Sequence, residues 1–374
     1  MAESESEMTS ERYDEGQQPA HHVGPQRGQA GPFHAGDRDG PMGGGRGASD
    51  GNEPGNLSQQ AAHVEEVSPL RNQAGDVRCR RIAVCGDDFG MNEAIDGALI
   101  ELAGAGRLSA VSCMPLAPAF AADAPALARL DVDLGVHVDF TEAFAGAAPA
   151  APGLAALLWR AYAGQLDPDW IDARLASQFD AFERAFGRAP DYVDGHQHVH
   201  QLPGILPRLR ALLKRRYAGQ RIWLRHTAPG LQFGLPLAEA AKARLIGALG
   251  AGALARAAGQ EGWQTNRRML GVYGFTGGPR RYAGLLHHWL MNARDGDLLM
   301  CHPGWPQVHG AAHASQRAAE YEVLAHPELG TWLARNGLRI VRLSQVRGRQ
   351  ASQESGKVRN VPHSGSFRRL ASRL

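Results

Sequence analysis

The chain has 374 residues, of which 43% are hydrophobic, and a formal net charge of +2 at pH 7. This length allows one large domain or two small ones, and the near-neutral charge gives no general reason to expect a nucleic acid or a membrane as partner. Four cysteines, Cys79, Cys85, Cys113 and Cys301, show no C-x-x-C spacing. Reduced thiols are therefore expected rather than a disulfide or a zinc ribbon.

The two ends of the chain differ in composition from the middle. Residues 1–78 are poor in large apolar side chains, cannot bury enough surface to offset chain entropy, and are expected to be disordered. Residues 347–374 are basic and are expected to form a loose tail. The polar start has no apolar segment typical of a signal peptide, and no apolar stretch reaches membrane-spanning length. We predict a cytoplasmic protein with its folded domain at 79–346; the oligomeric state stays open, a homodimer included.

Short apolar runs alternate with helical patterns inside this domain. Strands are predicted at 82–85, 110–114, 133–140, 191–195, 222–225, 271–274, 297–301 and 338–342. A helix is expected to begin at the N-cap residue Asn92, and others are predicted at 170–186, 205–213 and 237–257. Strands that alternate with helices imply βα units and a parallel sheet. Seven or eight such units favour an α/β fold with a distorted (β/α) barrel.

Acids and histidines stand where several of these apolar runs end. They are Asp87 and Asp88, His137, the triplet His196, His198 and His200 preceded by Asp194, and His302. The carboxyl ends of parallel strands meet at one edge of a sheet, where α/β enzymes place their catalytic groups. Two adjacent acids at a strand end are expected to put one carboxylate on each side of the backbone. Each residue alone is more often a cap or a structural hydrogen-bonding group, but the recurrence indicates a site.

One carboxylate and two imidazoles can hold a divalent ion and leave positions open for water and substrate. The candidate ligands are one acid of the Asp87–Asp88 pair, His137, and one histidine of the triplet. Such an ion lowers the pKa of its water, and the second acid can then act as general base. His302 could protonate a leaving amine. This set is what metal-assisted hydrolysis of an amide or ester requires.

The histidine triplet has alternate spacing, so an extended strand would point all three side chains to one face. The chain usually turns after a strand, so not all three can bind one ion. At least one is expected to contact the substrate or to hold another histidine by a hydrogen bond, and Asp194 is a candidate for such an orienting role. Four other histidines, His226, His287, His288 and His313, lie outside the pattern and receive no role.

Four motifs in this order resemble the YdjC-like carbohydrate deacetylase family, which includes chitooligosaccharide deacetylases and hopanoid-associated relatives. They are the segments 82–92, 135–137, 194–200 and 300–304, within a resemblance that spans about residues 80–346. The resemblance implies a (β/α) barrel-like fold related to polysaccharide deacetylases, with 79–346 as the catalytic domain. It also implies a divalent ion, magnesium or zinc, bound through Asp-His-His.

Carried over residue by residue, the resemblance implies Asp88, His137 and His196 as metal ligands. Asp87 would be the general base and His302 the proton donor or oxyanion partner. The spacing alone permits either order of the two acids. The helix with Arg317 and Glu320 also resembles an Arg-x-x-Glu segment of the family.

The chain departs from the family pattern at Asp139, where an apolar residue or Asn is common; an extra acid there could alter metal choice or substrate polarity. The interval 227–270 matches no family feature, and Trp263 or Tyr273 could stack on a sugar, although packing is the commoner role. The predicted function is removal of acetyl groups from a small N-acetylated carbohydrate, chitooligosaccharide-like or glycolipid-linked. The alternatives are a metal hydrolase acting on another amide, ester or glycosidic substrate, and a sugar-binding protein without turnover.

Overall fold

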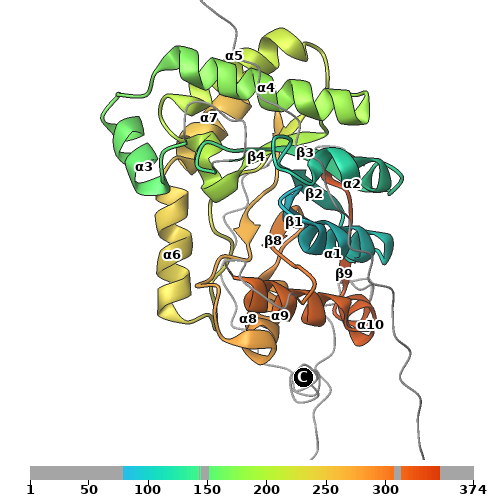
Figure 1. Cartoon of the computed structure of the whole chain (residues 1–374). Helices are drawn as coiled ribbons and strands as arrows, with labels where there is room; N and C mark the ends of the chain where they lie inside the picture. Colours follow the sequence, from blue (N-terminus) through green and yellow to red (C-terminus); the bar gives the residue numbers. More distant parts are fainter. Residues whose placement is uncertain (1–78, 143, 145–150, 307–312, 346–374) are drawn as a thin grey trace, which may run out of the picture. The chain divides into compact units, whose positions relative to one another are not determined.

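The structure, a computed structural model, describes residues 79–142, 144, 151–306 and 313–345. A parallel sheet lies at its centre, with the strand order β6-β5-β4-β3-β2-β1-β8-β7 and with β9 paired to β1 (Figure 1). The strands are β1 (Arg80–Phe89), β2 (Ala110–Cys113), β3 (Asp133–Val138), β4 (Tyr192–Gly195), β5 (Trp223–Leu224), β6 (Gln264–Thr265), β7 (Met269–Leu270), β8 (Asp297–Cys301) and β9 (Leu338–Ile340). The predictions for residues 1–78 and 347–374 concern segments outside the described residues.

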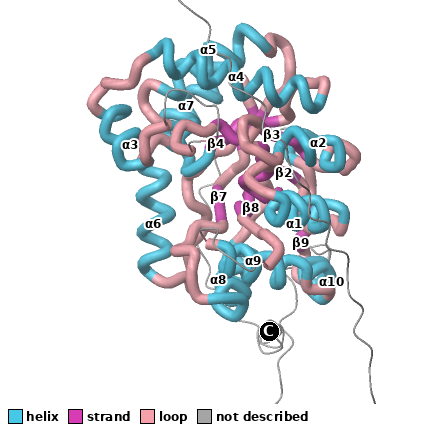
Figure 2. The backbone as a smooth tube through the Cα atoms, viewed as in Figure 1, coloured by secondary structure: helices cyan, strands magenta, loops and turns pink. Residues whose placement is uncertain are grey.

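Hydrogen bonds beyond the end of β5 bring the two ends of the sheet together. The backbone N–H of Gly230 donates to the carbonyl of Met269 (2.8 Å), and the N–H of Met269 donates to the carbonyl of Ala228 (2.9 Å). Pro229 and Met269 thus form a parallel bridge between the segment after β5 and β7. The sheet curls into the distorted barrel that the alternating pattern predicted (Figure 2).

The first strand shows how the two faces of the sheet are filled. Ile82 and Val84 pack in the main core with the surrounding helices, whereas Ala83 and Cys85 belong to a smaller cluster. All four side chains are buried. Both faces of a parallel sheet are covered, which is why the strand reads as a continuous apolar run rather than as an alternating one.

Large aromatic side chains fill the smaller cluster. The rings of Tyr192 and Trp223 stack with centroids 4.0 Å apart. A Cβ atom at Gly135, on the neighbouring strand β3, would lie 2.3 Å from the Tyr192 ring. The Tyr192 ring therefore fits only because residue 135 is glycine. Large and small side chains alternate in this way in the layers that fill a barrel.

Helices cover the sheet, with α4 and α5 above it and α8, α9 and α10 below it in the view of Figure 1. Their bounds are α1 (Glu93–Gly104), α2 (Phe120–Leu127), α3 (Leu154–Tyr162), α4 (Pro168–Phe186), α5 (Ile205–Arg216), α6 (Leu237–Ala248), α7 (Ala251–Glu261), α8 (Gly278–Asn292), α9 (Ala314–Ala325) and α10 (Glu328–Arg335), with short 3-10 helices η1 (His196–Gln201) and η2 (Leu343–Gln345). The side chain of Asn92 accepts a hydrogen bond from the N–H of Ile95 (3.1 Å), so the predicted cap is confirmed.

Two predicted elements differ from the structure. The single helix expected at 237–257 is two helices, because Gly250 between them has φ 147° and a Cβ there would lie 2.4 Å from the Gln201 carbonyl oxygen. The strand expected at 271–274 is Met269–Leu270 instead, since Gly271 turns away with φ 97°. The four cysteines are free thiols, as predicted. Among the helices of the described residues, none combines the length and apolarity needed to cross a membrane.

Candidate active site

The two acids at the end of β1 line the same cleft instead of opposite faces of the strand. Asp88 has φ 73°, a left-handed conformation that is uncommon for a residue other than glycine. The regular alternation of side chains ends at this residue, and both carboxylates are almost fully buried. A strained backbone at a cluster of polar groups is typical of functional sites.

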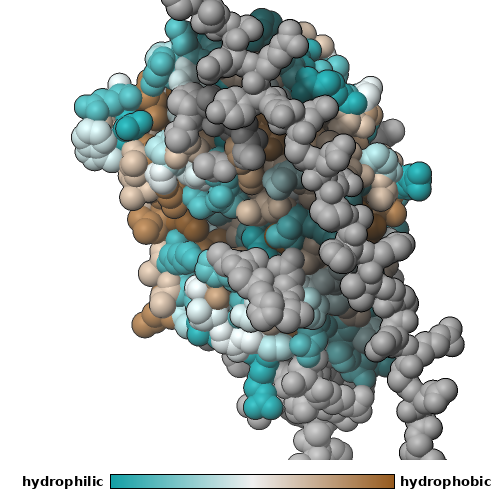
Figure 3. Space-filling model, in the orientation of Figure 1, coloured by the Kyte–Doolittle hydropathy of each residue, from teal (hydrophilic) through white to brown (hydrophobic). Residues whose placement is uncertain are grey.

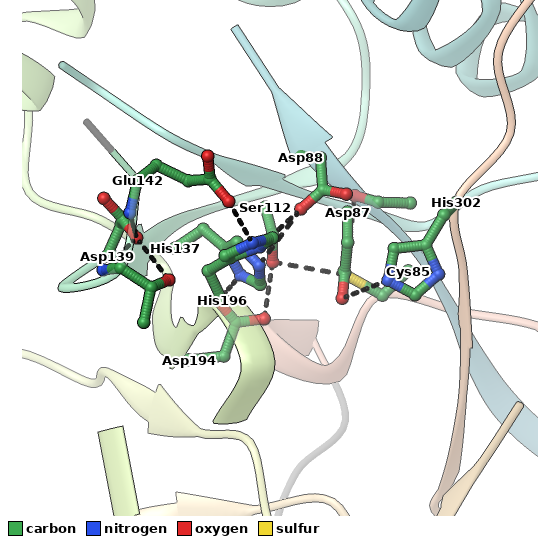
Figure 4. Close-up of polar contacts among 12 residues, drawn as sticks. Cys85, Asp87, Asp88, Ser112, His137, Asp139, Glu142, Asp194, His196 and His302 are labelled. Atoms are coloured by element: carbon green, nitrogen blue, oxygen red, sulfur yellow. Dashed lines mark hydrogen bonds and ion pairs between the residues drawn. The ribbon is translucent and has the colours of Figure 1, made fainter. Parts of the chain in front are cut away.

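Asp88 lies beside two histidines from other strand ends. Its Oδ1 is 3.0 Å from Nδ1 of His196 and 3.5 Å from Nε2 of His137 (Figure 4). One ligand atom from each of the three residues lies within 4.8 Å of the others. Two imidazole nitrogens and one carboxylate oxygen at this separation fit a divalent ion with open positions.

Each of these histidines has a second carboxylate on its other ring nitrogen. Nδ1 of His137 is 2.7 Å from Oδ1 of the fully buried Asp194. Nε2 of His196 is 3.3 Å from Oε1 of Glu142, whose side chain is 36% exposed. Metal-bound imidazoles commonly have such a partner, which fixes the tautomer and the orientation of the ring.

The charges of the cluster shift its ionisation. Burial alone would lower the pKa of His137, but the carboxylates of Asp194 and Asp88 raise it to about 9. Burial likewise opposes protonation of His196, yet Asp88 and Glu142 raise the pKa of that imidazole to about 10. The pKa of Asp88 lies well below its usual value, because the Arg317 guanidinium and the imidazoles outweigh the burial that would raise it. The carboxylates therefore hold both imidazoles in the protonated form when no ion is bound, and a divalent ion would take the place of these protons.

Asp87 faces a different group, the buried guanidinium of Arg225 at the end of β5. Nη1 and Nη2 of Arg225 lie 2.5 and 2.6 Å from the two carboxylate oxygens of Asp87. Nη2 also lies 2.6 Å from Oδ2 of Asp194, which in turn accepts a hydrogen bond from the Ser112 hydroxyl (2.5 Å). One arginine thus fixes both Asp87 and the acid behind His137, and a two-point pair of this kind sets the carboxylate's orientation.

His302, at the end of β8, lies on the Asp87 side of the cluster, as Figure 4 shows. Its Nε2 is 3.8 Å from Oδ2 of Asp87. Burial lowers the pKa of the imidazole to about 4, so the ring is neutral at pH 7. The backbone N–H of His302 donates to Oε2 of the buried Glu320 (2.6 Å), which also accepts the Tyr273 hydroxyl (2.6 Å).

The histidine triplet separates because the chain turns directly after β4. His196 begins η1, and Gln197 and His198 both have positive φ, 51° and 63°. His198 lines the cleft, whereas His200 is fully buried with Nε2 2.9 Å from the carbonyl oxygen of Arg225. Burial lowers the pKa of both imidazoles, that of His200 to about 4.

The cleft has a volume of about 510 Å³ and two unlike walls. Aliphatic side chains form the first wall, and aromatic and cationic side chains form the second. The first wall consists of Leu154 and Leu158 from α3 with Leu245, Ile246 and Leu249 around α6; the same helix adds Lys242, whose Nζ donates to the carbonyl of Tyr273 (2.6 Å). The second consists of Tyr273, Phe275, His302, His313 and Arg317. The metal-ligand candidates lie in this same cleft.

Asp139, Trp263 and Tyr273 were each named as residues that could affect the metal or the substrate, and their contacts in the structure show where each side chain lies. Asp139 does not face the cluster: its Oδ1 accepts hydrogen bonds from residues 141 and 142, and its Oδ2 is 3.0 Å from Nη2 of Arg174. Tyr273 is buried and bonded to Glu320, and Trp263 packs against the main core. Asp139 is therefore a loop-forming residue, Trp263 packs against the core, and Tyr273 lines the cleft while its hydroxyl is bonded to Glu320.

Several residues near the cluster were missed from the sequence. Arg225 follows the apolar run at 222–224, so the strand-end signal that identified Asp87 could have identified it too. Glu142 lies on an irregular loop with no such signal. Phe275 and His313, whose rings lie 5.2 Å apart at the second wall, come from loops between elements and also carry no pattern.

Comparison with known proteins places the chain among relatives. A family model described as "YdjC-like protein" matches residues 81–335. The carbohydrate deacetylase of Homo sapiens is 26% identical over 309 residues, which cover 73% of this chain and 93% of that protein. The chitooligosaccharide deacetylase of Yersinia pestis (strain Pestoides F) is 29% identical over 186 residues, 49% of this chain and 64% of that protein.

A solved structure supports the fold independently of these sequence relatives. The putative cellobiose-phosphate cleavage protein of Enterococcus faecalis V583 superposes with a TM-score of 0.53 and 16% identity, over 71% of this chain and 97% of that one. At this identity the likeness concerns the fold alone. The family model, in contrast, covers more than half of the sequence and includes the strand ends that form the cluster. The chain therefore belongs to the YdjC-like protein family.

Proposed function

We propose that the protein is a metal-dependent hydrolase that removes acetyl groups from an N-acetylated carbohydrate, with residues 79–346 as its catalytic domain. The observation that carries the proposal is one cleft that holds both the Asp88–His137–His196 cluster and the Asp87–His302 pair. The names of the curated relatives, which are deacetylases and thus hydrolases, support it. A cytoplasmic location and a homodimer stay predictions.

The metal ligands in this proposal are Asp88, His137 and His196. When bound, the ion would polarise the acetamide carbonyl and make a water more acidic. Two imidazoles with one carboxylate favour zinc over magnesium, because magnesium prefers oxygen ligands. Asp194 holds the His137 ring by its Nδ1.

Asp87 is the proposed general base. Arg225 fixes the orientation of the Asp87 carboxylate, so the carboxylate is already oriented toward an attacking water before the reaction. His302 is neutral at pH 7 and offers a ring nitrogen to the developing oxyanion or to the leaving group. His302 must be protonated before it can donate a proton to the leaving amine. In this proposal Asp87 takes a proton from the attacking water, and its Oδ2 lies 3.8 Å from Nε2 of His302, to which the proton can pass.

The cleft also bears on which acetylated sugar is used. A chitooligosaccharide is polar along its length, yet the first wall is aliphatic. Leu245 of this wall is 62% exposed, Trp159 on α3 is also 62% exposed, and Figure 3 shows apolar surface over α6 at the left of the view. Apolar surface next to a polar centre fits a substrate with both characters. A glycolipid-linked sugar is therefore favoured over a chitooligosaccharide; His198, His313 and Arg317 would contact its polar part.

The test is acetate release from three substrates measured in parallel: N,N′-diacetylchitobiose, methyl N-acetyl-β-glucosaminide and the octyl analogue. We expect release of acetate in stoichiometric amounts with free amine, and a kcat/KM for the octyl glycoside at least about tenfold above that for the methyl glycoside. Equal values for both would remove the glycolipid preference. Sugar binding without acetate release from any N-acetyl sugar would instead support the non-catalytic alternative.

A further inference from the structure

The loop after β3 carries Glu142, whose carboxylate contacts His196 on the side of the ring opposite Asp88. Oε1 of Glu142 lies 3.3 Å from Nε2 of His196, while Nδ1 of the same ring lies 3.0 Å from Asp88. The imidazole thus bridges two carboxylates, and Figure 4 shows the ring between them. If Nδ1 binds the ion, Nε2 carries the proton and needs an acceptor, which Glu142 supplies.

The backbone that holds Glu142 is fixed from two sides. Oδ1 of Asp139 accepts the N–H of Glu142 (3.0 Å), which closes a tight turn. The buried Arg174 of α4 bonds both to the Asp139 carboxylate (3.0 Å) and to the carbonyl of Glu142 (3.1 Å). Gln178, one turn further along α4, bonds to both backbone groups of Asp139 (2.7 and 3.1 Å). The backbone of Glu142 is therefore held in one position, from which its carboxylate contacts Nε2 of His196.

His196 needs such a partner more than His137 does. His137 lies inside a paired strand, between neighbours with regular hydrogen bonds. His196 opens a turn in which the next two residues, Gln197 and His198, adopt left-handed conformations. A ring on an irregular turn is oriented by its side-chain contacts rather than by a regular backbone.

We infer that Glu142 is a positioning residue that orients His196 for metal binding, and that Asp139, Arg174 and Gln178 hold the loop which presents it. This inference rests on the proposed metal-dependent function. It gives the acid at 139 a role without any contact to the ion: it builds the turn from which Glu142 reaches the histidine. Glu142 does not touch substrate or reacting atoms in this account.

The experiment measures the dissociation constant of Zn²⁺ by competition with a chromophoric chelator, on the full chain. Glu142→Ala is expected to weaken zinc binding about 10–100-fold, because outer partners of metal-bound histidines typically have effects of that size. Glu142→Gln should weaken it less, since the amide oxygen can still accept the Nε2 hydrogen. Glu322→Ala, which removes an exposed glutamate of α9, is the matched control and should bind zinc as wild type does.

A second measurement separates positioning from substrate binding. At saturating zinc the Glu142→Ala protein should recover most of its kcat with an unchanged KM, since only ion loading is impaired. Zinc affinity equal to wild type in Glu142→Ala overturns the inference, and so does a loss in both variants as large as that of His196→Ala, which would make Glu142 itself a ligand. A wild-type protein that binds no divalent ion defeats the proposed function instead.

Discussion

The carboxylate of Asp87 and the guanidinium of Arg225 form a buried two-point pair next to the metal-ligand candidates. The arginine has 0% exposure and also contacts Asp194, so it connects the proposed base with the acid behind His137. One cation in this position keeps two neighbouring carboxylates close together. Without it, their mutual repulsion in a buried site would favour protonation of one of them.

Asp87→Asn is predicted to lower kcat by at least about 100-fold, the usual contribution of a general base. The asparagine keeps one oxygen for Arg225 and leaves Asp88, His137 and His196 unchanged, so zinc affinity should stay close to that of wild type. Acetate release and zinc titration on the same preparation check both parts. Asp169→Asn, on the exposed start of α4, is the matched control. Unchanged turnover would remove Asp87 from the mechanism.

The buried carboxyl of Glu320 accepts the backbone N–H of His302 and has a shifted pKa. Burial raises the pKa of its carboxyl from 4.5 to about 7, against the hydrogen bonds from Tyr273 and His302. The pKa is raised in the folded state, so its contribution to stability is fully present below pH 4.5 and is lost as pH rises through about 7. The difference of about 2.5 pKa units corresponds to roughly 3 kcal/mol.

Glu320→Gln is accordingly predicted to remove this part of the pH dependence. Between pH 5 and pH 8 the Tm of wild type should fall relative to that of the variant, which cannot ionise there. Thermal unfolding of both proteins across this range is the measurement. Parallel curves for the two proteins would mean that the carboxyl does not titrate in this window.

The break between α6 and α7 is a feature of elements rather than of the site. Gly250 has φ 147°, and a Cβ there would approach the Gln201 carbonyl oxygen to 2.4 Å. Gly250→Ala is predicted to lower the free energy of unfolding by about 2–4 kcal/mol, through backbone strain and displacement of Gln201 at the end of η1. Gly259→Ala is the control: this glycine lies inside α7 with nothing near its Cβ position, and alanine should stabilise the helix by about 0.5–1 kcal/mol. Urea unfolding of both variants measures the two free energies of unfolding. An equal change in Gly250→Ala and Gly259→Ala would contradict the proposed role of Gly250.

Elements with local signals could be predicted from the sequence, and those that depend on distant approaches could not. The apolar run of β1 and the cap at Asn92 are local, and both were recognised. The helix pattern over 237–257 has no local reason to stop, because one glycine is tolerated in a helix and the reason lies at Gln201. The two-residue strand β6 is too short to leave a periodic signal.

The same distinction holds inside the site. Asp87, Asp88, His137 and His302 follow apolar runs, and a parallel sheet brings such positions to one edge, so their proximity could be expected. Arg225 also follows an apolar run, so its place at this edge could be expected, but its two-point pair with Asp87, 138 residues away, could not. Glu142 reaches His196 only because Arg174, more than 30 residues along the chain, holds its loop. Both contacts required the three-dimensional arrangement.

The barrel combines these parts into one cleft. Strands β1, β3, β4, β5 and β8 are all parallel and end at the same edge, so the acids, histidines and Arg225 converge although they span residues 87–302. The aliphatic wall from α3 and α6 faces the same cleft from outside the sheet. This chain thus joins a charged cluster to apolar surface. The divalent ion of the proposed function should stabilise the fold as a ligand of the native state.

The proposal that the protein is a metal-dependent carbohydrate deacetylase is tested most directly by acetate release from octyl N-acetyl-β-glucosaminide before and after removal of divalent ions. Wild type treated with a chelator and then dialysed should lose acetate release. One equivalent of zinc should restore it in wild type but not in Asp87→Asn, and the Tm should rise on zinc addition. Full acetate release by the chelated, metal-free protein would contradict the account.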